Sequence, residues 1–285
     1  MKPAPFDYVR PASVEEAIAL LGGGGDGAKV LAGGQSLIPT MNFRLAQPSL
    51  LVDLADLDEL TGIRSSGDGG LWIGAMTRQR TVERSPLVRE AAPLLADVMP
   101  WVAHPQIRNR GTIGGSLAHA DPAAELPAVV AALEAAMVVR GPDGTRCVPA
   151  REFYLGLFTT ALEPGELLVA VEVPPPGDGT RFAFEEVARR HGDFALAGVA
   201  VALTRDGGGT VSDAAVSLLG VDEVPVLSTA ASELIGRRPD PETVAAVADA
   251  TAAALEPPGD IHATPDYRRH LAGVLTRRAL ERACA

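Results

Sequence analysis

Apolar residues recur along the chain with helical spacing in some segments and in short runs typical of strands in others. Residues 13–21 have the helical spacing, and Ser13 followed by Glu16 forms the S-x-x-E capping box of a helix start. The glycine-rich run 22–27 is predicted to end this helix. The first thirty residues therefore predict one helix leading into a strand.

The middle of the chain predicts further short strands and helices. Thr77 is the predicted N-cap of a helix, and residues 86–99 have an amphipathic helical pattern. A second helical pattern covers 126–135, and 136–150 predicts two strands joined by a Pro-Asp-Gly turn. Strands are also predicted at 30–32, 50–57 and 71–76, and before residue 174.

The sequence PPPGDG at 174–179 is the clearest linker, and we place a domain boundary there. Alternating and β-branched strands follow around a Gly-Gly-Gly hairpin turn, and helical patterns cover 228–236, 241–255 and 265–283. In the last helix one apolar face is predicted from Tyr267, Leu271, Val274 and Leu275. The arginines on its other faces fit either a solvated surface or a docking face for an acidic partner; they are Arg268, Arg269, Arg277, Arg278 and Arg282.

Composition narrows the class of protein. The 285 residues are 47% apolar, which is ordinary for a globular chain of one or two domains. The net charge of −11 argues against binding to nucleic acid or to an anionic membrane. Cys147 and Cys284 are far apart, so neither a zinc site nor an iron–sulfur site is predicted. With no signal peptide and no apolar run long enough to span a membrane, we expect a cytoplasmic protein.

Two glycine segments are the main candidates for chemistry. The first, KVLAGGQSL at 29–37, runs from a short strand into Gly-Gly, and the second is IRNRGTIGGSLAHADPAAELP at 107–127. Glycine allows positive φ and close approach of a ligand to the backbone, and successive N–H groups with nearby hydroxyls can bind an anion. The following helix begins either at Pro122, with Asp121 as N-cap, or only at Pro127.

Each segment alone is also compatible with a simple tight turn. Two such turns about eighty residues apart, each flanked by hydroxyl or amide side chains, favour a shared phosphate site instead. The segment 29–37 lacks the Rossmann spacing, and the glycine run 22–27 lacks the lysine of the Walker spacing. His104 fits a ligand or base, or a hydrogen-bonded loop residue, and Arg108 and Arg110 fit phosphate contacts or a solvated flank.

Four segments resemble the FAD-binding medium subunit of the molybdenum hydroxylases, the family of aerobic carbon monoxide dehydrogenase and xanthine dehydrogenase. They are AGGQSLIP at 32–39, TIGGSLAHADPAAELP at 112–127, RRHGDFALAGVAV at 189–201 and DIHATPDYRRHLAGVLTRRAL at 260–280. The resemblance covers nearly the whole chain.

The resemblance implies an α+β fold. An FAD-binding domain of the vanillyl-alcohol-oxidase/PCMH type would occupy 1–175, in two subdomains of about 1–56 and 57–175. A smaller C-terminal domain of the carbon monoxide dehydrogenase type, an antiparallel sheet with helices, would occupy 180–285.

The resemblance also implies the residues that contact FAD. They are Val30, Leu31, Ala32, Gly33, Gly34, Gln35, Ser36, Leu37, Val102, Ala103, Gly111, Thr112, Ile113, Gly114, Gly115, Ser116, Ala124, Glu125, Leu162 and Phe194. Glu125 would lie on the adenosine side, where relatives often carry aspartate, and Phe194 would lie near the isoalloxazine ring. Some relatives place a lysine near the flavin where this chain has Glu185 and Glu186, so the flavin potential or the acceptor may differ.

The implied role is electron transfer, with no catalytic acid, base or nucleophile and no metal site on this chain. A small subunit with two 2Fe–2S clusters and a large molybdopterin subunit are the implied partners, in a heterohexamer. The chain lacks the insertion that adds a 4Fe–4S cluster in one branch of the family, and nothing in it binds molybdenum cofactor. The alternatives are a stand-alone FAD oxidoreductase and a scaffold protein without flavin; the substrate and the electron acceptor stay open.

Overall fold

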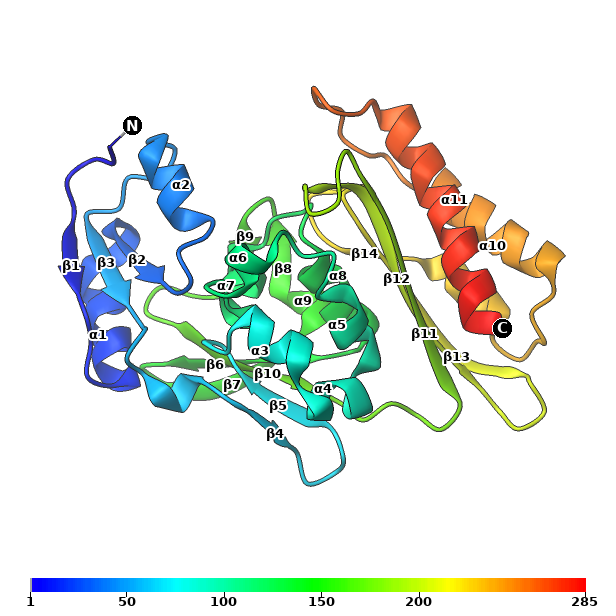
Figure 1. Cartoon of the computed structure of the whole chain (residues 1–285), viewed down its shortest axis with the longest axis horizontal. Helices are drawn as coiled ribbons and strands as arrows, with labels where there is room; N and C mark the ends of the chain where they lie inside the picture. The colour runs from blue at the N-terminus through cyan, green and yellow to red at the C-terminus, as the bar shows by residue number, and fades with distance from the viewer. Residues whose placement is uncertain (1) are drawn as a thin grey trace.

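The computed structural model describes residues 2–285 and contains three main sheets, arranged in a row with helices between and outside them (Figure 1). The first sheet has the order β1-β3-β2 and is entirely parallel. Parallel neighbours need long connections, and α1 and α2 provide them. The bounds are β1 Asp7–Val9, α1 Val14–Gly24, β2 Ala28–Leu31, α2 Leu37–Asn42 and β3 Leu50–Asp53.

The N-terminus of α1 follows the prediction closely. The Ser13 hydroxyl accepts from the Glu16 N–H at 3.2 Å, while the Glu16 carboxylate accepts from the Ala12 N–H at 2.6 Å. The helix ends inside the predicted glycine run, at Gly24, and a 3₁₀ turn follows at Gly25–Gly27. Buried Val14, Ala17, Ile18 and Leu21 hold it against the sheet in spite of the poor helix propensity of glycine.

The second sheet is antiparallel, in the order β4-β5-β10-β6-β7. Its strands are β4 Ile63–Ser65, β5 Leu71–Gly74, β6 Ala136–Gly141, β7 Gly144–Pro149 and β10 Leu167–Val173. Short helices fill the long connection between β5 and β6: α3 Gln79–Arg84, α4 Pro86–Ala91, α5 Pro93–Val98, α6 Pro105–Arg108, α7 Ile113–His119 and α8 Glu125–Ala132. After β7 come α9 Ala150–Phe153 and a small hairpin of β8 Tyr154–Gly156 and β9 Thr159–Thr160.

Three predicted features of this region were wrong. The single helix at 86–99 is two helices, because Pro93 has no N–H to continue α4 and starts α5 instead. Thr77 does not cap a helix, since its hydroxyl bonds to the backbone of Gly62. Asp121 is not an N-cap: its carboxylate accepts from the Ala123 N–H at 2.9 Å in a turn, and α8 begins at Glu125 with Pro127 in its first turn.

The third sheet is the antiparallel β11-β12-β13-β14, as the sequence predicted for the C-terminal part. Its elements are β11 Thr180–Ala188, β12 Ala195–Arg205, β13 Val211–Leu219, β14 Val226–Leu227, α10 Pro241–Ala253 and α11 Pro265–Cys284. The β12–β13 turn contains the three glycines, and Asp206 accepts from the Gly208 and Thr210 N–H groups within it. Residues 229–234 form a 3₁₀ helix and not the predicted α-helix.

Helices α10 and α11 cover the outer face of the third sheet, while α5 and α8 lie on its inner face (Figure 1). The buried face of α11 is offset from the prediction, because Tyr267 is 45% exposed and Leu271, Ala272, Leu275 and Ala279 are buried. Arg268 also departs from the prediction of a surface arginine. It is buried and donates to the carbonyls of Leu196 and Gly220.

The largest apolar core joins the second and third sheets. It contains Leu95 of α5 and Val129 of α8 together with Phe184, Ala200 and Leu219 from β11, β12 and β13. Trp101 packs edge-on against Phe184, with ring centroids 5.9 Å apart. The linker at 174–179 is therefore an exposed connection beside a continuous core. Within the described residues, no helix is long and apolar enough to cross a membrane.

Candidate functional site

The two glycine segments, eighty residues apart in sequence, touch each other in the structure. A Cβ built on Gly33 would lie 2.7 Å from Gly111 Cα and closer still to the Arg110 carbonyl oxygen. Gly115 faces Ala32, where an added Cβ would be 3.3 Å from the Ala32 methyl carbon. The contact at Gly33 requires glycine, because Cβ atoms do not approach backbone atoms this closely, and the contact at Gly115 is tight. The prediction that these segments form one site agrees with this contact.

The first segment presents a row of unused backbone donors. Val30 and Leu31 end β2, Ala32 to Ser36 form the loop, and Leu37 begins α2. Within residues 2–285, the N–H groups of 33–37 have no protein acceptor. The Gln35 amide holds the turn by donating to the Gly33 carbonyl at 3.0 Å, and Gly34 has a φ of 71°, which favours glycine. Gly33 is buried and residues 34–37 are partly or fully exposed. Successive N–H groups without partners form a site that can accept an anion.

The second segment differs from the predicted loop, because it is the start of helix α7. Thr112 is the N-cap, and its hydroxyl accepts from the Gly115 N–H at 3.0 Å. The N–H groups of Ile113 and Gly114 donate to the carbonyls of Thr77 and Ala75 at 3.0 and 2.8 Å. Most N–H groups of this segment therefore already donate to acceptors within the protein. Gly115 and Ser116 are the partly exposed residues at the start of α7.

Arg108 has a structural role that neither sequence interpretation included. It is buried, pairs with Glu83 at 3.0 Å, and donates to the carbonyls of Val102 and Ala103 at 2.9 and 3.2 Å. These bonds fix a turn in which Ala103 has a φ of 46°. The only signal in the sequence was an arginine at the start of the second glycine segment. Arg110, by contrast, is exposed, and its carbonyl accepts from Arg78.

The turn at Val102 and Ala103 meets the loop that carries Phe194. A Cβ on Gly192, whose φ is 87°, would lie 2.8 Å from the Ala103 carbonyl and 2.6 Å from the His104 ring. His191 stacks on Trp101, with ring centroids 5.6 Å apart. Phe194 itself is 68% exposed. A large aromatic ring with that exposure is available to contact another molecule.

Three predicted residues lie apart from the glycine contact. Leu162 is half-buried against the large core, and Ala124 is the residue before α8. Glu125 is only 6% exposed, so most of its side chain is closed to solvent, and burial raises its pKa to about 7. His119, at the end of α7, was not singled out from the sequence. Its ring lies 5.0 Å from that of Phe158, and burial lowers its pKa.

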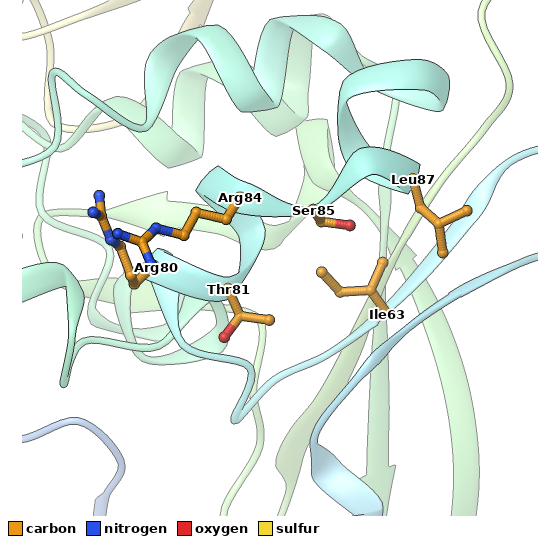
Figure 2. A pocket seen from close by; sticks show the side chains of 6 residues that line it. All are labelled: Ile63, Arg80, Thr81, Arg84, Ser85 and Leu87. Atoms are coloured by element: carbon orange, nitrogen blue, oxygen red, sulfur yellow. The ribbon is translucent and has the colours of Figure 1, made fainter.

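An open depression occurs elsewhere, beside α3 and α4 (Figure 2). Its rim carries Arg80 and Arg84 near one end and Ile63 and Leu87 at the other. Arg80 is paired with Glu83 at 2.7 Å, so its charge is already partly compensated. None of the residues predicted to bind the cofactor lines this depression.

Comparisons with known proteins cover nearly the whole chain. Residues 4–176 match the model of the "FAD binding domain in molybdopterin dehydrogenase", and residues 182–283 match the "CO dehydrogenase flavoprotein C-terminal domain". The carbon monoxide dehydrogenase medium chain of Hydrogenophaga pseudoflava is 44% identical, over 100% of this chain and 99% of the relative. The subunit alpha of the 6-hydroxypseudooxynicotine dehydrogenase complex of Paenarthrobacter nicotinovorans is 43% identical, over 99% and 96%.

A solved structure agrees with these relatives. A chain of carbon monoxide dehydrogenase from Hydrogenophaga pseudoflava, in a form lacking the Mo-pyranopterin moiety of its cofactor, superposes with a TM-score of 0.96 at 45% identity. The alignment covers 99% of this chain and 98% of that one. Fold and sequence therefore lead to the same group of proteins.

Proposed function

The chain belongs to the FAD-binding subunits of the molybdopterin dehydrogenases, and from that premise we propose that it holds one FAD at the paired glycine segments and passes electrons from an iron–sulfur partner to an external acceptor. FAD supplies the redox chemistry, since it accepts electrons and gives them up again. The residues of this chain bind the cofactor, orient it and limit access of water. The unpartnered N–H groups of 33–37 are the single observation that carries this proposal.

The first glycine segment fits the diphosphate of FAD. A diphosphate needs several hydrogen-bond donors on a surface without side chains, and the N–H groups beside Gly33 and Gly34 meet that need. Gly115 and the Ser116 hydroxyl complete the opposite wall, while Thr112 holds the start of α7 in place. We assign this role to Val30–Leu37 and Gly111–Ser116 as two groups.

The flavin ring is assigned to the other side of the same site. The turn at Val102 and Ala103, held by Arg108, offers backbone, while Leu162 and the exposed ring of Phe194 offer apolar contact. Ala124 and Glu125 are assigned to the adenosine side, although the burial of Glu125 leaves little of it for such a contact. Glu185 and Glu186 stand where some relatives carry a lysine, so no cation at these two positions favours an anionic reduced flavin.

The partners are proposed from the relatives. The relative from Hydrogenophaga pseudoflava is named as the medium chain of a carbon monoxide dehydrogenase, and that from Paenarthrobacter as a subunit of a complex. We propose that this chain likewise works with a 2Fe–2S small subunit and a molybdopterin large subunit, in a cytoplasmic heterohexamer. Because the named relatives serve different substrates, the large subunit, and not this chain, would select the substrate. Residues 1–175 and 180–285 are the proposed domains.

The test is an absorption spectrum of the purified chain, with and without added FAD and with and without co-expressed partners. We expect flavin bands that are lost in Gly34→Val, because a β-branched side chain at a φ of 71° distorts the row of N–H donors. Gly207→Ala is the matched control, since an added Cβ there meets nothing within 4 Å. Absence of flavin in every setting contradicts the proposal. Stable flavin and substrate turnover by the chain alone would favour a stand-alone oxidoreductase.

A further inference from the structure

One arginine of the C-terminal helix bonds to the backbone of the third sheet. Arg268 lies near the start of α11, which covers the outer face of that sheet (Figure 1). It is only 6% exposed, and its Nη1 donates to the carbonyls of Leu196 and Gly220 at 2.5 and 2.9 Å. Its Nη2 donates to the Asp260 carboxylate at 2.6 Å, which balances the charge. The other arginines of α11 are half-buried or exposed.

The two carbonyls lie where the pairing of β12 with β13 ends. Gly198 and Leu219 are the last register pair of these strands, and Leu196 and Gly220 lie beyond it. The two strand ends touch, because a Cβ on Gly220 would lie 2.9 Å from the Leu196 carbonyl oxygen. Buried carbonyls need a donor, and a planar guanidinium can serve several acceptors at once. Arg268 therefore holds the strand ends together past the last pair.

The contact with Leu196 fixes one side of the proposed FAD site. Leu196 is two residues after Phe194, the exposed ring that we assign to the flavin. The loop before Phe194 touches the turn at Val102 and Ala103 through Gly192, where a Cβ would lie 2.8 Å from the Ala103 carbonyl oxygen. A displaced start of β12 would therefore move this loop and its aromatic ring away from that turn.

The contact with Gly220 fixes the other side of the site. The Gly220 N–H donates to the Pro122 carbonyl at 2.9 Å, while its own carbonyl accepts from Arg268. Pro122 lies between α7, which carries Ser116, and α8, which begins at Glu125. One residue of the third sheet thus bonds both to α11 and to the segment that joins two groups of assigned cofactor residues.

The neighbouring Arg269 makes bonds of the same kind without this link. It donates to the Leu255 carbonyl at 3.0 Å and to the Asp266 carboxylate at 2.8 Å. Leu255 follows α10, and Asp266 belongs to α11 itself. These bonds therefore stay within the outer helical layer.

We propose that Arg268 is a positioning residue for the FAD site. From α11 it holds the start of β12 and the end of β13, and through them the Phe194 loop and the segment between α7 and α8. This role rests on the proposed function, in which FAD lies between those two segments. A ligand site is precise only when the segments that contact the ligand are themselves held by supporting hydrogen bonds. The C-terminal helix thereby sets the affinity for the flavin and the surroundings of its ring.

The first measurement is the dissociation constant of FAD for the wild type, Arg268→Gln and Arg269→Gln, with the partners co-expressed where flavin binding requires them. We expect Arg268→Gln to weaken binding by about 2- to 30-fold. Arg269→Gln is the matched control, because it removes the same charge and a similar set of bonds from the same helix. Its FAD affinity should stay near that of the wild type. The circular dichroism of bound flavin should change in Arg268→Gln alone.

Hydrogen exchange of the FAD-free chain, followed by mass spectrometry, tests the positioning itself. We expect residues 118–124 and 189–197 to exchange faster in Arg268→Gln, while the first sheet and the connection between α10 and α11 exchange as in the wild type. Arg268→Lys keeps a cationic donor and should restore part of the protection and of the FAD affinity. Asp260→Asn removes only the charge partner and should shift both readouts in the same direction, even if Arg268→Gln does not fold.

Three results would overturn the proposal. The first is an FAD affinity in Arg268→Gln equal to that of Arg269→Gln. The second is unchanged exchange in residues 118–124 and 189–197. The third is equally faster exchange throughout the third sheet, since Arg268 would then only stabilise the fold. A wild type that binds no FAD in any setting would overturn the proposed function as well, whereas a wild type with FAD and an unaffected Arg268→Gln variant would overturn this inference alone.

Discussion

Glycine serves two different physical purposes in the segments that we assign to the cofactor. At Gly34 the backbone itself requires it, because φ is 71°. At Gly33 and Gly114 the φ angles are ordinary, and glycine is required because the backbone of another segment lies too close for a Cβ. The contact of Gly33 with Arg110 and Gly111 places the loop after β2 against the segment that leads into α7.

Gly114→Ala tests the importance of that close approach. The new Cβ would lie 2.7 Å from the Cα and carbonyl oxygen of Ala75, which are backbone atoms of a buried segment. We expect a loss of about 1–3 kcal/mol in the free energy of unfolding from overpacking, together with a lower flavin content. Urea unfolding and the ratio of flavin to protein absorbance measure the two effects.

The control for Gly114→Ala is Gly67→Ala, in an exposed turn where an added Cβ meets nothing within 4 Å. It should change the free energy of unfolding by no more than about 0.5 kcal/mol. Equal stability and equal flavin content in both variants would show that α7 can shift away from Ala75 without consequence.

At the residue scale, the sequence predicted which segments form the site but not how each amide is used. The strand-to-glycine pattern of 29–37 and the T-I-G-G-S pattern of 112–116 were visible as candidate anion sites. That the N–H groups of Ile113 and Gly114 donate to Thr77 and Ala75 depends on the position of a distant segment. The role of Arg108 was not predicted either, because the position of its acceptors depends on tertiary packing.

At the scale of elements, local signals predicted helix starts well when a side chain itself makes the cap. Ser13 was predicted as a cap and accepts from the Glu16 N–H. The helices predicted from 241 and 265 begin at Pro241 and Pro265, where Asp240 and Thr264, not singled out from the sequence, each accept from an N–H three residues later. A prediction failed where tertiary contacts dominate: Tyr267 is exposed because α11 is rotated relative to the predicted face. The strands of the third sheet were predicted from alternating and β-branched residues. In the structure β12 is buried on both faces, because helices lie on both sides of the sheet.

The cap of α11 gives a prediction at this scale. The Thr264 hydroxyl accepts from the Tyr267 N–H at 3.2 Å, and α11 covers the outer face of the third sheet. We expect Thr264→Ala to lower the free energy of unfolding by about 1 kcal/mol, because one helix N–H loses its acceptor. Thr264→Ser keeps the hydroxyl and should retain most of that stability; equal losses in both would mean that the methyl group matters and the cap does not. Chemical denaturation followed by circular dichroism measures both.

At the scale of the whole molecule, a linker divides the chain into two parts, but the apolar core continues from one part into the other. Residues 174–179 are exposed and irregular, as the Pro-Gly composition predicted, and the two family models meet on either side of them. The apolar core nevertheless runs from α5 and α8 into β11, β12 and β13. Sequence patterns identify linkers, but they do not show which faces pack together across a linker, because that packing joins residues far apart in the chain.

The continuous core predicts that the two parts remain together after the linker is cut. A protease recognition sequence inserted between Gly177 and Asp178 lies in exposed backbone and should not disturb the fold. After cleavage we expect the fragments to co-elute in size-exclusion chromatography, because separation would expose Phe184 and Leu219 on one side and the α8 surface on the other. Either fragment expressed alone should aggregate or unfold for the same reason. Fragments that separate and fold independently would show that the contact between the two parts is weak.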